Sequence, residues 1–442
     1  MGAATRGRTR RARPGVPVPS RGQRSNEPPA GAFAASAGAT AVTLRRAPRS
    51  GLVLRRLVLT EAALAAGAVG FELGGAALAG SAVIAGLLMP FAVMPRRGRA
   101  AAGRLSTALA LRTRRRDASA AAPGTDPQLA PVAEGVPGLA PYGYVDRNRR
   151  TVGMVGDGTF LTAVVRVEAD GESPRPAHGG RTLPLSLLGD ALAVDDIVLE
   201  SAQLVQQVRP CPAPHLPQRS AARLSCAPFQ ERIGAPALRM TWVAVKLDPE
   251  LCREAVEARG GGLGGAQRCL VRVADHVASR ITGAGFRAVV LDQEELHCAV
   301  ATSACARPLL SGRTGRPDAA AQRRTSETTR GWRCDDRRHT AYAVRRWPDS
   351  SRGAASLPGL VALLASVPAY ATAFGLTVRR GSRRGEVSIC GHVRITGGSD
   401  TELAQVRRAL ERAARQAGVR LMRLDREQLP GVLATLPLGG AR

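Results

Sequence analysis

The stretch AGFRAVVLDQEEL at residues 284–296 is matched by AGVRLMRLDREQL at residues 417–429. Without a gap, the two share Ala-Gly, Arg, Leu-Asp, Glu and a final Leu. Each predicts a short strand followed by a helix, because an apolar run ends at an aspartate that is followed three residues later by Glu or Gln. We therefore expect helix-capping boxes at Asp292 with Glu295 and at Asp425 with Gln428.

The chain around each copy repeats the same order of predicted elements. RMTWVAVKL at 239–247 resembles RHTAYAVRR at 338–346, and both read as strands. Helices are expected at 266–282 and from Ser399, where Ser399 and Glu402 form a further capping box. Two strand-helix-strand-helix units predict a mixed sheet covered by helices, of the α/β or α+β class. Common helix-start chemistry would also produce such a pattern, so a true internal duplication stays open.

The 442 residues exceed what one hydrophobic core usually serves, and composition divides them. We expect a tail, a membrane segment, a basic linker, two halves of a cytosolic body and an Arg-rich insert between those halves. The tail is rich in Arg, Pro and Gly and is expected to be disordered. The tail is 1–50, the membrane segment 51–98 and the basic linker 99–141. The first half of the body is 142–306, the insert 307–331 and the second half 332–442.

An almost unbroken apolar run extends from Leu57 to Met94. One membrane span needs roughly 20 residues, so this run suits two helices joined by a tight turn. Glu72 in the sequence FELGG marks that turn, because a carboxylate is costly inside hydrocarbon but is solvated among headgroups. The sequence predicts an N-terminal transmembrane hairpin with helices at about 57–71 and 73–93. A signal peptide, a buried hairpin of a soluble domain and a single tilted span are the alternatives.

The net charge of +28 is concentrated beside this apolar run, since 20 of the 63 basic residues lie within residues 1–116. Arginines flank both ends of the run and are absent from its turn, which by the positive-inside rule places both chain ends in the cytoplasm. The protein is therefore expected in the inner membrane, as a multi-pass protein. Anionic lipid headgroups are the expected partners of Arg96, Arg97, Arg112, Arg114, Arg115 and Arg116.

The glycine-rich stretch GGGLGG at 260–265 is the strongest hint of an enzyme, because it fits the dinucleotide fingerprint G-x-G-x-x-G. That fingerprint must directly follow a strand, whereas a proline-led helix is expected here at 249–258. Asp292, the acid expected downstream, is accounted for by helix capping. A membrane-bound nucleotide-dependent enzyme that uses this loop remains the alternative to a non-enzymatic protein.

Other catalytic and binding chemistry finds little support. Lys246 is the single lysine, which argues against Schiff-base and phosphate-loop lysines, and the eight cysteines form no CxxC pair. No catalytic, cofactor or metal residue is assigned. Core packing is preferred over metal binding for Cys390 with His392 and for Cys298 with Cys305, and solvation or capping is preferred over acid-base chemistry for Asp195/Asp196, Glu294/Glu295 and Asp335/Asp336. No nucleic acid is expected, because aromatic residues are only 3% of the chain.

The whole layout resembles the EccE component of actinobacterial type VII (ESX) secretion systems. The stretches that carry the resemblance are MTWVAVKLDPELC at 240–252, GAGFRAVVLDQEEL at 283–296, WRCDDRRHTAY at 332–342, EVSICGHVRITG at 386–397 and LDREQLPGVLATLPLGG at 424–440. The resemblance implies a non-enzymatic subunit that braces the cytosolic side of an inner-membrane secretion complex. It implies EccB, EccC and EccD as partners, with ATP hydrolysis belonging to EccC.

Overall fold

The computed structural model describes eight stretches of the chain: 96–121, 124–147, 149–169, 183–210, 237–307, 323–347, 367–381 and 386–440. It also describes the single positions 219, 221, 224, 225, 359 and 363. The predicted tail and the apolar helices at 57–71 and 73–93 lie outside these residues. Within the described part, no helix has the length and apolarity that a membrane crossing needs.

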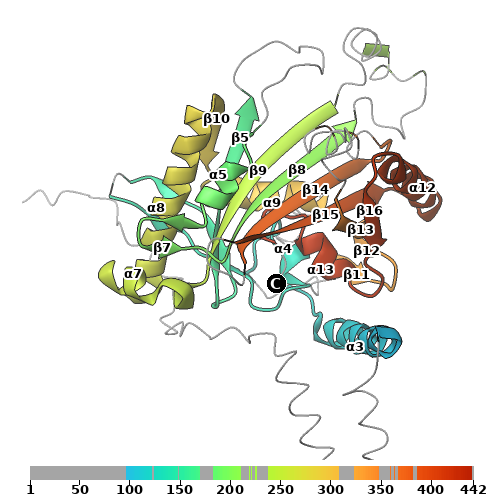
Figure 1. Cartoon of the computed structure of the whole chain (residues 1–442), viewed down its shortest axis with the longest axis horizontal. Coiled ribbons are helices and arrows are strands. Elements are labelled where there is room, and N and C mark those ends of the chain that lie inside the picture. The colour runs from blue at the N-terminus through green and yellow to red at the C-terminus, as the bar shows by residue number, and fades with distance from the viewer. Residues whose placement is uncertain are drawn as a thin grey trace, which may run out of the picture. The chain divides into compact units, whose positions relative to one another are not determined.

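The body is built on one large sheet with helices packed on it, as the sequence predicts (Figure 1). Among the described residues the strands follow the order β1-β4-β5-β9-β8-β14-β15-β13-β12-β11, with β10 added on β5 and β16 on β13. Every described strand pair is antiparallel, which favours α+β over α/β. The strands are β1 (Ala140–Pro141), β4 (Met154–Gly156), β5 (Leu161–Ala169), β8 (Ser201–Pro210), β9 (Ala237–Leu247), β10 (Phe286–Val290), β11 (Thr325–Glu327), β12 (Trp332–Cys334), β13 (Arg337–Arg346), β14 (Ala371–Arg380), β15 (Val387–Gly397) and β16 (Arg420–Arg423).

Alternating side chains send each strand's residues to two separate cores. The first core is covered by α5 (Ser186–Asp190), α7 (Arg253–Ala258), α8 (Gly262–Gly283) and α12 (Asp400–Gln416). The second core is covered by α4 (Ala130–Ala133), α9 (Gln293–Ala304) and α13 (Gln428–Leu433). On β9, for example, Val243 and Val245 face the first core, whereas Trp242 and Ala244 face the second. Two small ribbons complete the described part: β2 (Tyr144–Val145) with β3 (Thr151–Val152), and β6 (Ala193–Val194) with β7 (Ile197–Val198).

The two halves of the sheet repeat one arrangement, and the strand registers show it. Ser201 pairs with Lys246 as Ala371 pairs with Thr396, so β8 and β9 correspond to β14 and β15. In the same way β5 corresponds to β13. Strand β5 pairs with β9 and β10, and β13 pairs with their counterparts β15 and β16. The motif copies at 284 and 417 therefore occupy equivalent places, and α8 corresponds to α12.

The predicted match between residues 239–247 and 338–346 is wrong. The first segment lies in β9, whose counterpart is β15, whereas the second lies in β13, whose counterpart is β5. Alternating apolar patterns in neighbouring strands resemble one another, so the shared letters reflect half-buried strand chemistry rather than equivalent positions.

Of the three predicted capping boxes, Asp292 with Glu295 is confirmed in full. Ser399 accepts a hydrogen bond from the Glu402 N–H, but the Glu402 carboxylate accepts from the N–H of Gly398 instead. The box at Asp425 and Gln428 is wrong. Asp425 pairs with Arg423, and α13 begins three residues later, after Arg426 at a φ of +68°.

The segment 434–440 lies buried across the second face of the sheet, over the middle of the strands. Polar side chains of the strands hold it. Gln203 donates to the carbonyl oxygen of Ala434 and accepts from the N–H of Gly439, while Ser201 donates to the carbonyl of the same glycine. Arg394, 1% exposed, donates to the Thr435 hydroxyl. This face is therefore polar at its centre, and Gln203 and Ser201 bond there to the backbone of the 434–440 segment.

Candidate functional site

A basic helix, α3 (Arg96–Asp117), packs against the far edge of the sheet (Figure 1). Arg114 anchors it: the guanidinium donates two hydrogen bonds of 3.0 Å to the carboxylate of Glu327 and one of 2.6 Å to the carbonyl of Arg426. Arg115 adds a bond of 2.9 Å to the backbone oxygen of Glu327. The sequence predicted Arg114 as a lipid contact, but the structure places it in this ion pair instead.

Glu327 is suited to receive the helix because it is almost wholly buried, with its side chain 4% exposed. It also accepts the backbone N–H of Leu429, at the start of α13, over 3.0 Å. A buried carboxylate needs such partners, and both residues that donate to it, Arg114 and Leu429, lie outside its own strand, β11. Leu111, one turn before Arg114 on the same face of α3, is buried as well. The contact therefore ties α3, β11 and α13 together.

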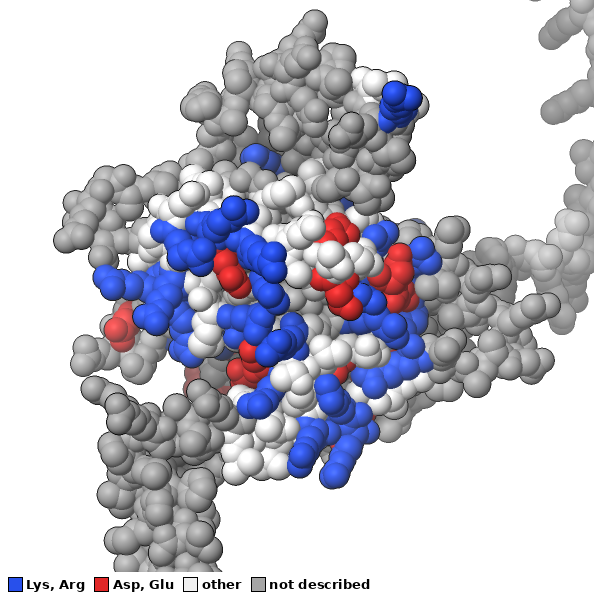
Figure 2. All heavy atoms as spheres, turned by 90° about the vertical axis from the view of Figure 1, so that its right-hand side faces the viewer, with Lys and Arg blue, Asp and Glu red and all other residues white. Residues whose placement is uncertain are grey.

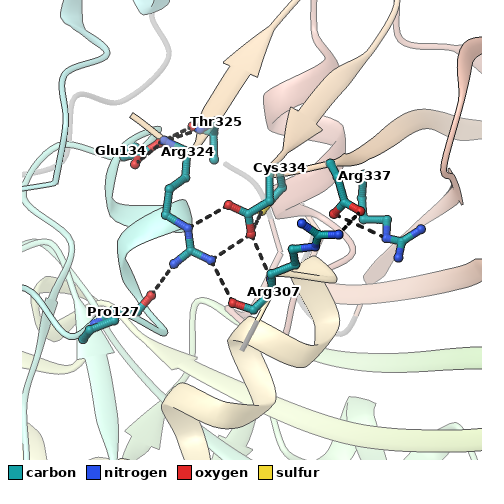
Figure 3. A network of polar contacts seen from close by, with 9 residues as sticks. Pro127, Glu134, Arg307, Arg324, Thr325, Cys334 and Arg337 are labelled. Atoms are coloured by element: carbon teal, nitrogen blue, oxygen red, sulfur yellow. Dashed lines mark hydrogen bonds and ion pairs between the residues drawn. The ribbon is translucent and has the colours of Figure 1, made fainter. Parts of the chain in front are cut away.

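A second buried carboxylate, Glu134, lies next to this contact at the end of α4 (Figure 3). It accepts the N–H groups of Arg324 and Thr325 and the Thr325 hydroxyl, over distances of 2.7–3.1 Å. The side chain of Arg324 then reaches the carbonyl of Pro127 at 2.7 Å. Residues 127–134, which lead from α3 into the body, are thereby held at two points by Arg324 and Thr325.

Arg324, labelled in Figure 3, forms a two-bond ion pair with Asp335, with both N···O distances at 2.8 Å and side chains 10% and 1% exposed. Burial alone would raise the pKa of Asp335, but hydrogen bonds from Arg324 and from the N–H of Arg307 outweigh it and lower the pKa below its ordinary value. Arg324 also donates to the carbonyl of Arg307. The two ends of the predicted insert are therefore held together, and β11 lies within residues 307–331.

The glycine loop at 260–265 does not follow a strand. A 3₁₀ turn at Pro249–Cys252 and α7 lie between it and β9, as the sequence predicts. Gly265 has a packing role, because a Cβ there would lie 2.4 Å from the carbonyl oxygen of Val256. Gly260, Gly261 and Gly262 have positive φ and form the tight turn into α8. The geometry gives the loop a structural explanation and no fingerprint for a dinucleotide.

The paired acids of the sequence have structural partners. Asp195 and Asp196 form ion pairs with Arg272 and Arg259, Glu295 caps α9, and Asp335 belongs to the buried pair above. No group of three or more His, Cys, Asp or Glu in the described part of the chain is arranged to hold a metal ion. Cys298 and Cys390 are exposed, so the expected core packing is wrong for both, while Cys305 is buried and accepts from Gln207.

The face that carries α12 is strongly basic, with few acidic side chains between the basic ones (Figure 2). Arg408, Arg412 and Arg415 are exposed along α12, and Arg420 follows at the start of β16. A cavity of about 820 Å³ opens at the C-terminal end of α12, lined among others by Arg415, Arg420 and Trp347. The sequence analysis did not single out this face, although the arginine spacing on a capped helix was a signal for it.

Part of the sheet-and-helix body is similar in sequence to known proteins. Residues 235–344, from β9 almost to the end of β13, match the EccE family model, described as a type VII ESX secretion system translocon. The chain is 32% identical over 145 residues to the ESX-1 secretion system protein EccE1 of Mycobacterium tuberculosis, in strains CDC 1551 / Oshkosh and ATCC 25618 / H37Rv. The aligned part is 30% of this chain and 29% of that relative, so it spans less than a third of either.

The family match contains Glu327, Arg324 and Asp335, the residues that receive α3 and join the ends of the insert. The sequence resemblance to this family is thereby confirmed. Residues 235–344 of the chain are thus similar to the EccE family of components of the type VII (ESX) secretion system.

Proposed function

We propose that this chain is a structural, non-enzymatic subunit that anchors and braces the cytosolic side of an inner-membrane type VII secretion complex, next to EccB, EccC and EccD. The observation that carries the proposal is the docking of α3 on the matched body through Arg114 and Glu327. Because α3 directly follows the apolar run 57–94, this contact would join the predicted membrane hairpin to the sheet without a loose linker.

Affinity purification tests the proposal most directly. The full chain, tagged and expressed with its own secretion system, is extracted in mild detergent and its companions are identified by mass spectrometry. We expect EccB, EccC and EccD homologues in stoichiometric amounts. In the separate variants T40C and R150C, a thiol reagent added outside the cell should leave the introduced cysteine unlabelled. A chain that comes out of the membrane alone contradicts the proposal.

The second part of the proposal concerns lipid. The face of α3 that points away from Leu111 and Arg114 carries Leu105 and Leu109, 54% and 52% exposed, one or two turns from Arg112 and Arg116, which are exposed too. Exposed leucines beside arginines on one face are typical of a helix lying in the headgroup layer of an anionic membrane. The side chains of Arg96 and Arg97 lie outside the described residues.

Vesicle flotation separates lipid binding from partner binding. The full chain in nanodiscs or detergent is mixed with vesicles of phosphatidylcholine alone or with added phosphatidylglycerol. We expect the variants L105Q/L109Q and R112Q/R116Q to weaken recovery with the anionic vesicles severalfold. Recovery that stays the same in both variants contradicts the lipid role of α3.

A further inference from the structure

We propose that the exposed arginine stripe of α12 is a docking surface for an acidic protein segment. The stripe consists of Thr401, Gln405, Arg408, Arg412 and Arg415, which lie on one face of the helix because their spacing is three or four residues. Among the described residues, the side chains of these three arginines form no hydrogen bond and no ion pair. Three unpaired positive charges within two turns repel one another, which is unfavourable unless a partner neutralises them.

The equivalent face of α8 shows what such a helix binds when it is covered. Counted back from the shared Ala-Gly, Arg408 corresponds to Asp275 and Gln405 to Arg272. Arg272 pairs with Asp195 at 3.0 Å, and Asp275 pairs with Arg150 at 2.9 Å. Those partners come from chain segments that run along α8. In the first half of the body, the outer face of this helix is therefore neutralised by carboxylates and arginines of the same chain.

The second half has no comparable supply of carboxylates. The segment between β5 and β8, residues 170–200, contains six acidic residues, of which Asp190 and Asp195 reach arginines of α8. The corresponding segment between β13 and β14, residues 347–370, contains one acid, Asp349. The three arginines of α12 therefore outnumber the acids that this segment can offer, and on this proposal the missing carboxylates come from another chain.

Two simpler explanations of the stripe fall short. Arginine in the last turn of a helix complements the negative end of the helix dipole, and Arg415 fits that role, but the effect fades within one turn and does not reach Arg408. An interfacial lipid site needs exposed apolar side chains among the basic ones, as α3 has, whereas the stripe of α12 holds only Thr, Gln and Arg. No aromatic side chain lies in the stripe to stack on a nucleic-acid base.

The cavity beside α12 extends this surface. Arg415 belongs to both the stripe and the cavity, and Arg420 continues the positive charge along the cavity wall. Trp347 also lines it, and a half-buried indole offers apolar contact area next to the charges. An acidic segment with one large apolar residue would thus find both of its features matched. In the complex proposed above, that segment belongs to a neighbouring subunit, and to this extent the inference rests on the proposed function.

The direct test uses the full chain in mild detergent and a labelled synthetic peptide of about 15 residues, or four helical turns, with glutamate along one face. A peptide with glutamine at those positions is its control. We expect R408Q/R412Q/R415Q to weaken binding of the glutamate peptide about tenfold, since each exposed ion pair contributes a severalfold effect at most. The variant R239Q/R287Q/R380Q removes the same charge from exposed arginines on other strands and should change binding less than twofold.

Equal losses in the two variants, or none in the α12 variant, would overturn the inference, because binding would then follow net charge alone. Stronger binding of phosphatidylglycerol vesicles or single-stranded DNA than of the peptide at the same arginines would overturn it as well. Copurification gives the independent readout. If the wild-type chain fails to bring down its companions, the proposed function fails, whereas the peptide measurement still decides the role of α12.

Discussion

Val205 of β8 and Gly375 of β14 pair with each other at the centre of the sheet. They are also equivalent residues of the two halves, because β8 pairs with β9 as β14 pairs with β15. The two halves thus meet around one residue pair. Their symmetry is broken there by the segment 434–440, which crosses so close to Gly375 that an added Cβ would lie 2.3 Å from the carbonyl oxygen of Ala434.

Substitution G375A should therefore lower the free energy of unfolding by about 2–3 kcal/mol, because the carbonyl is backbone and cannot move aside without disturbing the bonds to Gln203. Chemical denaturation followed by tryptophan fluorescence measures the change. The matched control is G189A in α5, where an added Cβ meets nothing within 4 Å and should be neutral or slightly stabilising. Equal effects of the two substitutions would contradict the close approach.

Substitution E327Q should loosen α3 without unfolding the body. Glutamine keeps an oxygen for the N–H of Leu429 but loses the charge that holds Arg114. We expect hydrogen exchange of the amides in residues 105–117 to quicken about tenfold or more, while exchange in β8 and β14 stays slow. R112Q, on the exposed face, serves as control and should leave exchange unchanged. Unaltered protection of α3 in E327Q would show that the ion pair does not hold it.

Substitution D335N should cost about 3–5 kcal/mol of unfolding free energy, since it leaves the buried Arg324 without its counter-charge. Asparagine tolerates the φ of +51° at this position, so backbone strain does not enter. D336N, which removes only a half-exposed partner of Arg307, should cost under about 1 kcal/mol. A double-variant cycle with R324M measures the coupling, and additive losses would refute it.

Stability should fall as the pH drops from about 6.5 to about 4. Burial, with the nearby charge of Arg379, lowers the pKa of His392 from 6.5 to about 4, so in that window the unfolded chain binds a proton that the folded chain does not. The loss should reach up to ~3 kcal/mol. Burial lowers the pKa of His339 as well and acts in the same direction. In denaturation series at both ends of this range, H392Q should show a smaller drop; an equal drop would assign the effect to other groups.

The repeated motif predicted the sheet-and-helix body because a strand, an aspartate and a capped helix are local signals. The pairing of the strands was beyond such signals, since register depends on residues far apart in sequence, and similar alternating patterns led to the wrong match of β9 with β13.

The candidate site was harder to foresee for the same reason. Glu134, Glu327 and Asp335 are ordinary acids in sequence, and only the fold shows that each is buried against its partner, which is Thr325, Arg114 and Arg324 in that order. Arg114 was predicted for lipid because charge density near an apolar run is visible in sequence, whereas its buried partner 213 positions away is not. The sequence places the arginines of α12 on a helix, but it does not show which of them lack a partner.

The hydrogen-bonded ladder that runs unbroken from β5 through β8 and β14 to β13 has a mechanical consequence. Two halves joined by a flexible hinge would not transmit a force applied to α3, whereas a continuous sheet transmits it as a rigid body. A displacement of α3 at one edge of the sheet would therefore also displace α8 at the opposite edge. Partners bound at the two edges would be mechanically coupled.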